Sequence, residues 1–395
     1  MEPTPPPTGP RAAPGGAAGT PTQLALAAES IEGAGVRVRR YREEDVEDVR
    51  VGCDDPLTQR FLPLLPSPYT YEEAAWWIAE GSVTSFMSGG GNFAIADPGS
   101  DRLLGGIGIT HQREGSGEIG YWVAPWGRGR GVATAATIAL TGYAFLAGYG
   151  RLQLRTEYEN LASQRVALGA GYRREGVQRS SAIGRDGARH DLVVWARTPG
   201  DPPGPTPRLL PDLPGGTLSD GVVALRPLGR ADAPHIHALY TEPDVAATAV
   251  GEPPRSMVDT ARFCARAGST WLAGTSAHFA VRELTTGELV GDAVLFDVAP
   301  LTRTAMVGYS MRGPWRRRGY AGRAVRLLSR WALRDAGLAR LTAGTAPDNV
   351  ASQRVLEKVG FVREGYQRGH LPTLNGGRAD VVSYGLLPAD LKASG

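Results

Sequence analysis

The 395-residue sequence lacks the features that mark several large classes of protein. It contains only two cysteines, Cys53 and Cys264, which lie far apart and form no CxxC or Cys/His spacing. This argues against a disulfide framework and against a zinc site, so no metal is expected. A reducing cytoplasm is the expected location.

The charge is nearly balanced, and long apolar runs are absent. The 43 basic and 40 acidic residues give a net charge of +3 at pH 7, which does not suit a chain that coats nucleic acid. No apolar run approaches the roughly 18 residues needed to span a bilayer. The proline-rich start also lacks the basic and apolar blocks of a signal peptide. We therefore expect neither a membrane nor a nucleic-acid partner.

Two segments rich in proline and glycine divide the sequence. Residues 1–35 offer little apolar surface to offset chain entropy, so they are predicted to form a disordered tail. Residues 198–220, TPGDPPGPTPRLLPDLPGGTLSD, favour an extended chain and are predicted to be an interdomain linker. The division predicts an N-terminal domain over residues 36–197 and a C-terminal domain over residues 221–388, both of ordinary domain size.

The two predicted domains carry the same pattern. NLASQRVALGAGYRREG, which begins at Asn160, matches NVASQRVLEKVGFVREG, which begins at Asn349. WGRGRGVATA, which begins at Trp126, matches WRRRGYAGRA, which begins at Trp315. The chain is therefore a duplication of one domain, since solenoid repeats recur every 20–50 residues.

Apolar spacing predicts the same mixed order of strands and helices in each half. In the N-terminal half the expected strands are residues 36–41, 92–97, 103–111, 118–123 and 152–157, and the expected helices are residues 43–51, 70–81, 131–148 and 161–171. We therefore predict an α/β protein of two tandem domains, each with one curved mixed sheet flanked by helices.

A glycine-containing turn precedes the long helix of each half. The pattern R-x-x-G-x-A occupies residues 128–133 and again residues 316–321. Its glycine permits a tight turn, and the free amides at the start of the helix favour a phosphate or pyrophosphate. No Gly-Lys-Ser/Thr follows, so the turn is not a nucleotide-hydrolysing loop of the Walker type.

The combined motifs resemble the GNAT superfamily of acetyl-CoA-dependent N-acetyltransferases. The resemblance rests on EIGYWV and R-x-x-G-x-A, followed about 30 residues later by N-x-x-S-x-x-V and Gly-aromatic-x-x-E-G, and it covers both halves. The pattern is most similar to the RimJ/RimL branch, which acetylates N-terminal amines of ribosomal proteins and includes relatives acting on small-molecule amines. It implies transfer of an acetyl group from acetyl-CoA to a primary amine by direct attack.

The resemblance also implies roles for individual residues. The turn and the preceding strand would hold CoA, a serine would protonate the departing thiolate, and a glutamate would act as base. The implied catalytic residues are Glu118, Ser163 and Ser352, and the implied cofactor-binding residues are Tyr121, Trp122, Val123, Arg128, Gly129, Gly131, Ala133, Asn160, Tyr309, Ser310, Met311, Arg316, Arg318, Gly319, Ala321 and Asn349.

Two alternatives remain open at this point. Met306 occupies the C-terminal position that matches Glu118, so the C-terminal half is either a second enzyme or a non-catalytic CoA-binding or structural domain. The helix that follows Trp315 is rich in arginine, which is also a feature of nucleic-acid-binding helices. Its two aromatic residues, Tyr320 and Trp331, lie too far apart for a base-stacking platform.

Overall fold

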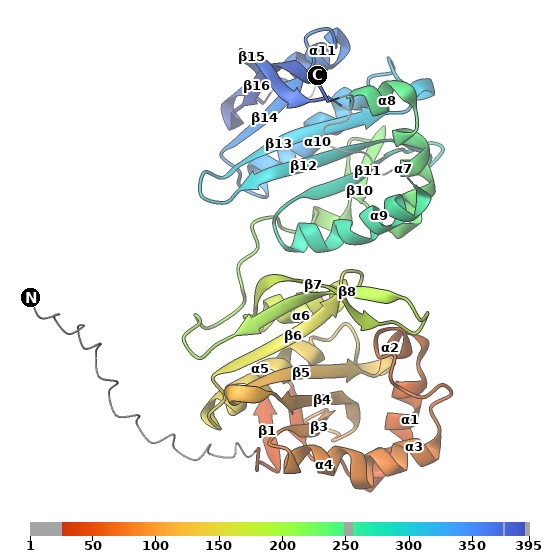
Figure 1. The fold of residues 1–395 in the computed structure, drawn as a ribbon, viewed down its shortest axis with the longest axis vertical. Coiled ribbons are helices and arrows are strands. Elements are labelled where there is room, and N and C mark those ends of the chain that lie inside the picture. Colours follow the sequence, from red (N-terminus) through yellow and green to blue (C-terminus); the bar gives the residue numbers. More distant parts are fainter. Residues whose placement is uncertain (1–25, 249–255, 374–375, 392–395) are drawn as a thin grey trace, which may run out of the picture.

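The computed structural model describes residues 26–248, 256–373 and 376–391. These residues form two eight-stranded mixed sheets, one from each half of the chain (Figure 1). The strand orders are β1-β2-β3-β4-β5-β6-β8-β7 and β15-β16-β14-β13-β12-β11-β10-β9. The prediction of an α/β protein with two tandem domains is confirmed.

The N-terminal domain follows the predicted order of elements. Its strands are β1 (Ser30–Gly33), β2 (Val36–Arg39), β3 (Gly91–Ala96), β4 (Leu103–His111), β5 (Ser116–Val123), β6 (Arg151–Glu157), β7 (Arg173–Ile183) and β8 (Arg189–Arg197). Its helices are α1 (Val46–Asp54), α2 (Pro56–Phe61), α3 (Tyr71–Trp76), α4 (Ser82–Met87), α5 (Val132–Leu146) and α6 (Leu161–Gly169). Strand β1 lies within residues 1–35, so the prediction of a disordered tail is wrong for this part of it; residues 1–25 lie outside the described residues.

The C-terminal domain repeats this order. Its strands are β9 (Leu218–Ser219), β10 (Val223–Pro227), β11 (Ala277–Glu283), β12 (Leu289–Ala299), β13 (Thr304–Met311), β14 (Arg340–Thr345), β15 (Val362–Pro372) and β16 (Arg378–Leu386). Its helices are α7 (Ala233–Tyr240), α8 (Pro243–Thr248), α9 (Met257–Leu272), α10 (Tyr320–Arg334) and α11 (Val350–Val359). Strand β9 lies within the predicted linker, so the linker is shorter than expected.

The long helix of each half packs an apolar face against its sheet. On α5, Ala136, Leu140 and Ala144 are fully buried at the four-residue spacing of one helix face. On α10, the Trp331 ring lies 5.7 Å from the Phe279 ring of β11. This packing fixes the first turn of each helix at the end of the strand before it.

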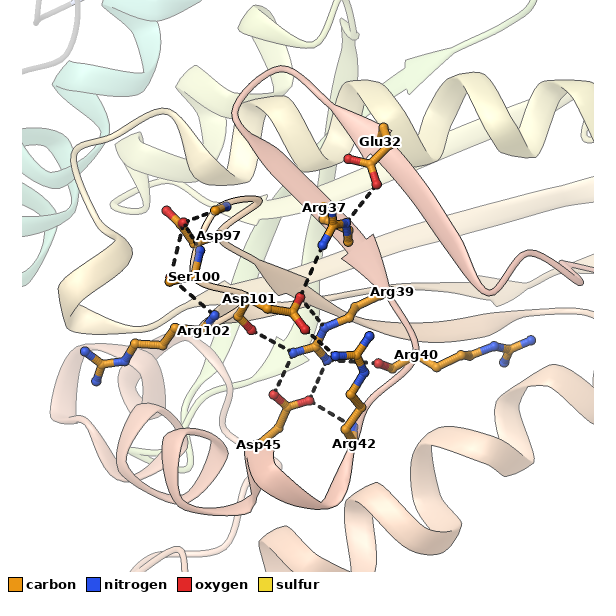
Figure 2. A network of polar contacts seen from close by, with 11 residues as sticks. Glu32, Arg37, Arg39, Arg40, Arg42, Asp45, Asp97, Ser100, Asp101 and Arg102 are labelled. Carbon is orange, nitrogen blue, oxygen red and sulfur yellow. Dashed lines mark hydrogen bonds and ion pairs between the residues drawn. The ribbon is translucent and has the colours of Figure 1, made fainter.

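A buried ion pair fixes the start of the N-terminal domain (Figure 2). Arg39 on β2 donates from Nη1 and Nη2 to the two carboxylate oxygens of Asp45, at 2.7 and 2.9 Å, and both side chains are about 95% buried. Arg39 Nε also donates to Asp101, on the turn between β3 and β4, at 3.1 Å. The network therefore joins β2, the start of α1 and that turn.

The C-terminal domain also neutralises the acid at the start of its first helix, but with an arginine from a different strand. Asp232 holds the position of Asp45, but its partner is Arg282 on β11, whose Nη2 lies 2.5 Å from the Asp232 carboxylate. Arg226, which matches Arg39 on the equivalent strand, is exposed. The acid has kept its place while the neutralising base comes from the adjacent strand.

The segment between the two sheets contacts both domains. The Thr206 amide donates to the carbonyl of Leu168 on α6 at 2.8 Å, and Trp271 Nε1 on α9 donates to the carbonyl of Pro211 at 3.0 Å. Helix α9 also contacts α6 directly, and it faces the edge of the N-terminal domain that carries β7 and β8 (Figure 1).

Candidate functional site

Each sheet opens between two parallel strands. Strand β5 pairs with β6 only from Ser116 to Glu118, and β13 pairs with β14 only from Thr304 to Met306. Beyond those pairs, residues 119–123 and 307–311 have no partner on the parallel strand. The two strands therefore separate beyond these pairs in both halves, which leaves backbone groups available to an extended ligand.

The glycine turn lies at the open end of the splay. Gly131 and Gly319 are the N-caps of α5 and α10, with φ of 75° and 82°, the left-handed region that glycine adopts without steric cost. Neither offers a side chain to the helix amides, and a Cβ built on either residue would meet no described atom within 4 Å beyond its chain neighbours. The first turn of each helix is thus open to an anionic group, as P-loop-like anion sites are.

The second residue of the turn differs between the halves. Gly129 has a φ of 73°, whereas Arg317 holds the matching position with a φ of 62°. Left-handed backbone costs an arginine more than a glycine. The C-terminal turn keeps the same backbone conformation despite that cost.

The first arginine of each turn anchors the loop. Arg128 donates from Nε to the carbonyl of Val123 at 3.1 Å and from Nη2 to Thr58 Oγ1 at 2.9 Å, and it pairs with Asp55. This ties the turn to the start of α2.

The C-terminal half is built in the same way. Arg316 donates from Nε to the carbonyl of Met311 at 3.0 Å, and it pairs with Asp244 at 2.8 Å and with Glu242 at 3.3 Å. Sequence reasoning missed these acidic partners, although each lies beside a proline, in DDP and in EPD.

The predicted asparagine and serine meet at the start of α6. Asn160 is the N-cap, and its carboxamide oxygen accepts from the Ser163 amide at 3.1 Å. The Ser163 hydroxyl lies 2.7 Å from the Tyr121 hydroxyl, which also donates to the Ser163 carbonyl at 3.3 Å. Burial raises the pKa of Tyr121 above its ordinary value, and the hydrogen bond to Ser163 offsets only part of that rise. The phenol therefore stays protonated at neutral pH.

The C-terminal half repeats this pair. Asn349 caps α11 and accepts from the Ser352 amide at 3.1 Å, and the Ser352 hydroxyl lies 2.7 Å from the Tyr309 hydroxyl. Burial raises the pKa of Tyr309 to about 12. A hydroxyl pair formed by a strand and a helix 42 or 43 residues later was not predicted, although both members were named as site residues.

Glu118 lies at the last paired position of β5, opposite Gln153 on β6. Its carboxylate accepts from Arg155 Nε at 2.8 Å and from the side-chain amides of Gln112 and Gln153 at 3.1 Å each. Met306 holds the same register position in the C-terminal sheet. The carboxylate is therefore present in one half only, and it is held by three donors.

The remaining predicted residues lie on β5 and β13 or in the first turns of α5 and α10. Trp122 points away from Tyr121 and packs in the cluster between α1 and β4, where a Cβ on Gly52 would meet its ring at 2.3 Å. Met311 is 8% exposed and belongs to the C-terminal core. The other predicted residues are partly exposed at the strand end or in the first helical turn, and they are Val123, Ser310, Ala133 and Ala321.

Three of the basic residues around α10 have protein partners. Arg323 pairs with Asp220 at 2.8 Å, Arg326 Nη2 donates to the carbonyl of Lys358 at 3.3 Å, and the Arg318 guanidinium lies 5.1 Å from the centre of the Trp315 ring. Within the described ranges, no group of three or more metal-ligating side chains occurs. No described helix has the length and apolar character needed to cross a bilayer.

Comparisons with known proteins match both halves. A family model described as the acetyltransferase (GNAT) domain matches residues 36–173 and again residues 223–362. The probable N-acetyltransferase YjcK of Bacillus subtilis (strain 168) is 36% identical over 92 residues, which are 23% of this chain and 51% of that protein. The uncharacterized N-acetyltransferase YoaA of the same organism is 33% identical over 86 residues, which are 22% of this chain and 49% of that protein. This chain thus spans about half the length of the curated relatives it matches.

Solved structures also match one domain at a time. Mycobacterium smegmatis RimJ in complex with CoA-disulfide has a TM-score of 0.41 and 23% identity, over 45% of this chain and 89% of that chain. A probable acetyltransferase has a TM-score of 0.41 and 24% identity, over 44% of this chain and 98% of that chain.

Proposed function

This chain belongs to the GNAT acetyltransferase family, and on that premise we propose that it transfers the acetyl group of acetyl-CoA to a primary amine. One observation carries the proposal. In both halves a helix start without a side-chain cap lies at the end of a strand that has separated from its parallel neighbour. Such an arrangement suits a ligand that has an anionic group and an extended amide-containing arm.

We propose that both halves hold CoA in the same way. The amides of the first turns of α5 and α10, after Gly131 and Gly319, would bind the pyrophosphate. The unpaired backbone of β5 and β13 would bind the pantetheine amides, with Asn160 and Asn349 beside it. Acetyl-CoA supplies an activated acyl group whose thioester carbon is open to attack by an amine.

The hydroxyl pair of each half is proposed to protonate the leaving thiolate. As the C–N bond forms and the C–S bond breaks, the sulfur gains negative charge, and Ser163 would donate a proton to it. Tyr121, at 2.7 Å, would restore the proton to Ser163 and would regain one from solvent once the products leave. Ser352 and Tyr309 would act in the same way in the C-terminal half.

The acceptor is proposed to be the α-amine of a polypeptide or a small amine of similar pKa. With a pKa of about 7.8, roughly a seventh of an α-amine is neutral at pH 7, whereas a lysine with a pKa of about 10.4 is almost entirely protonated. Glu118 is the proposed acceptor of the amine proton, directly or through water. Three donors bind its carboxylate, two on Oε2 and one on Oε1, which leaves a lone pair on Oε1 for that proton.

The C-terminal half has a second candidate role. Met306 replaces Glu118 at the same register position, so this half has no carboxylate there. It would bind CoA through the turn at Gly319 while transferring acetyl groups slowly or not at all. The missing carboxylate at Met306 is the observation that supports this second role.

Titration calorimetry of the full chain with acetyl-CoA tests the proposal. The wild-type protein is expected to bind two molecules, and Gly131→Asp and Gly319→Asp are each expected to remove one site, because the added carboxylate repels the pyrophosphate. Release of CoA in the presence of a peptide with a free α-amine should be lost mainly in the Gly131→Asp variant. An absence of binding by the folded wild-type chain would refute the proposed function.

A further inference from the structure

The N-terminal active-site helix contains a buried glutamine that closes the loop before it. Gln164 follows Ser163 on α6 and is completely buried. Its Nε2 donates to the carbonyls of Glu157 and Tyr158 at 3.0 Å each. These bonds fix the chain between the end of β6 and the start of α6, and so they fix the place of Ser163.

The remaining polar atom of this glutamine is satisfied by the other domain. Gln164 Oε1 accepts from the hydroxyl of Ser269 at 2.8 Å. Ser269 lies on α9 of the C-terminal domain and is 1% exposed. A buried carboxamide oxygen without a donor is unfavourable, so the Ser269 hydroxyl determines whether Gln164 keeps this conformation.

The duplicated half provides an internal comparison. Gln353 on α11 makes the same two bonds, from Nε2 to the carbonyls of Ala346 and Pro347 at 3.3 and 2.9 Å. Its residue is only partly buried, so water can reach it. The C-terminal site is therefore built without a neighbouring domain, whereas the N-terminal site uses one.

Close packing surrounds the bond between the domains. A Cβ on Gly268 would lie 2.5 Å from a terminal methyl of Leu161, the first residue of α6, so a larger residue there would have to displace the Leu161 side chain. Leu272, also on α9, is 4% exposed and belongs to the hydrophobic core of the N-terminal domain. Arg266 pairs with Asp191 of β8 at 2.6 Å. Helix α9 thus contacts the N-terminal domain at α6, at β8 and at its hydrophobic core.

We propose that Ser269 is a positioning residue for the N-terminal site: through Gln164 it holds α6, and with it Ser163, in the place needed for acetyl transfer. This inference rests on the proposed function. It gives the C-terminal domain a role in the chemistry of its neighbour, whether or not the C-terminal domain is itself an enzyme.

The test compares Ser269→Ala with Ser329→Ala in the full chain. Ser329 is a suitable control because it is also a fully buried serine in a C-terminal helix, and its hydroxyl has no hydrogen-bond partner within the described residues. Both variants are made in the Gly319→Asp background, so that the measured turnover belongs to the N-terminal half. The readouts are kcat, KM for acetyl-CoA, and hydrogen exchange of the α6 amides.

Ser269→Ala is expected to lower kcat about tenfold or more, since small displacements of a reacting group are costly. KM for acetyl-CoA should change by less than about threefold, because the Gly131 turn is untouched. Exchange of the α6 amides should become faster, and Ser269→Thr, which keeps the hydroxyl, should restore much of the rate. Gly268→Val should show the same split by displacing α9 from α6.

Two results would overturn the inference. One is a kcat for Ser269→Ala equal to that of Ser329→Ala, with or without a lower melting temperature, because it would reduce Ser269 to a purely structural contact. The other is unchanged exchange in α6. The exchange measurement needs no activity, so a folded chain that transfers no acetyl group would refute the proposed function while still deciding whether Ser269 holds α6.

Discussion

Replacing Ser163 by alanine removes one hydroxyl, and this should affect folding stability and turnover to different extents. The Tyr121 hydroxyl loses its 2.7 Å partner but keeps the carbonyl of residue 163 at 3.3 Å, so it remains held. The loss of one hydrogen bond costs about 1 kcal/mol of folding stability. Proton transfer by a positioned group typically contributes a factor of about 10² to 10⁴, or about 3–5 kcal/mol of the barrier. The variant should therefore stay folded and bind acetyl-CoA, but turn over at least about 100-fold more slowly.

A double-mutant cycle distinguishes a relay from two independent groups. If Ser163 and Tyr121 pass one proton, Ser163→Ala combined with Tyr121→Phe should be no slower than the slower single variant, because either change breaks the same path. Independent groups would multiply their effects, to a loss of about 10⁴ or more. The assay is CoA-thiol release in the Gly319→Asp background.

Two results would refute this reasoning. Turnover of Ser163→Ala within about threefold of the parent would show that the hydroxyl is not the proton donor. Multiplicative effects in the double variant would show that the tyrosine acts separately. An unchanged dissociation constant for acetyl-CoA in all variants confirms that the loss lies in the chemical step.

Three further predictions concern charged groups. Arg39→Met should lower the free energy of unfolding in urea by about 3–5 kcal/mol, because Asp45 stays buried without its partner. The double variant Arg39→Met/Asp45→Leu should recover most of that loss. An equal loss in the single and double variants would contradict this explanation. Burial raises the pKa of Asp292 to about 6, so the carboxyl of the unfolded chain loses its proton at a lower pH, and the free energy of unfolding should fall by about 2 kcal/mol between pH 4 and pH 7. Asp292→Asn should lack that fall, and a parallel profile in the variant would exclude this group as its source. Glu118→Gln should lower turnover at pH 7 without changing acetyl-CoA affinity, and pH–rate profiles that coincide with those of the wild type would exclude it as the base.

The duplication made the fold predictable from sequence. A helix predicted over residues 161–171 is observed over Leu161–Gly169, and the glycine turn leads into α5 as expected. These features depend on local signals, such as an asparagine cap and a glycine at a left-handed position. Because both copies carry them in one register, each supports the interpretation of the other.

The direction of the site side chains was not predictable in the same way. Both faces of β5 are covered by helices, so the alternation of a strand does not indicate which of Tyr121 and Trp122 faces α6. The partners of Arg128 lie 70 and 73 residues away, and only the folded chain brings them together. The bond from Ser269 to Gln164 spans 105 residues and two domains, and no sequence motif records it.

The exchange of arginines between the two copies bears on how these domains can be recombined. A hybrid in which β10 replaces β2 would place Arg226 at the position of Arg39. In its own domain Arg226 is exposed, and Arg282 neutralises the acid at the start of the first helix instead. A hybrid that carried both β2 and β11 would instead offer two guanidinium groups to one carboxylate. Domain shuffling between the halves should therefore move both strands together, because each domain neutralises this acid with an arginine from a different strand.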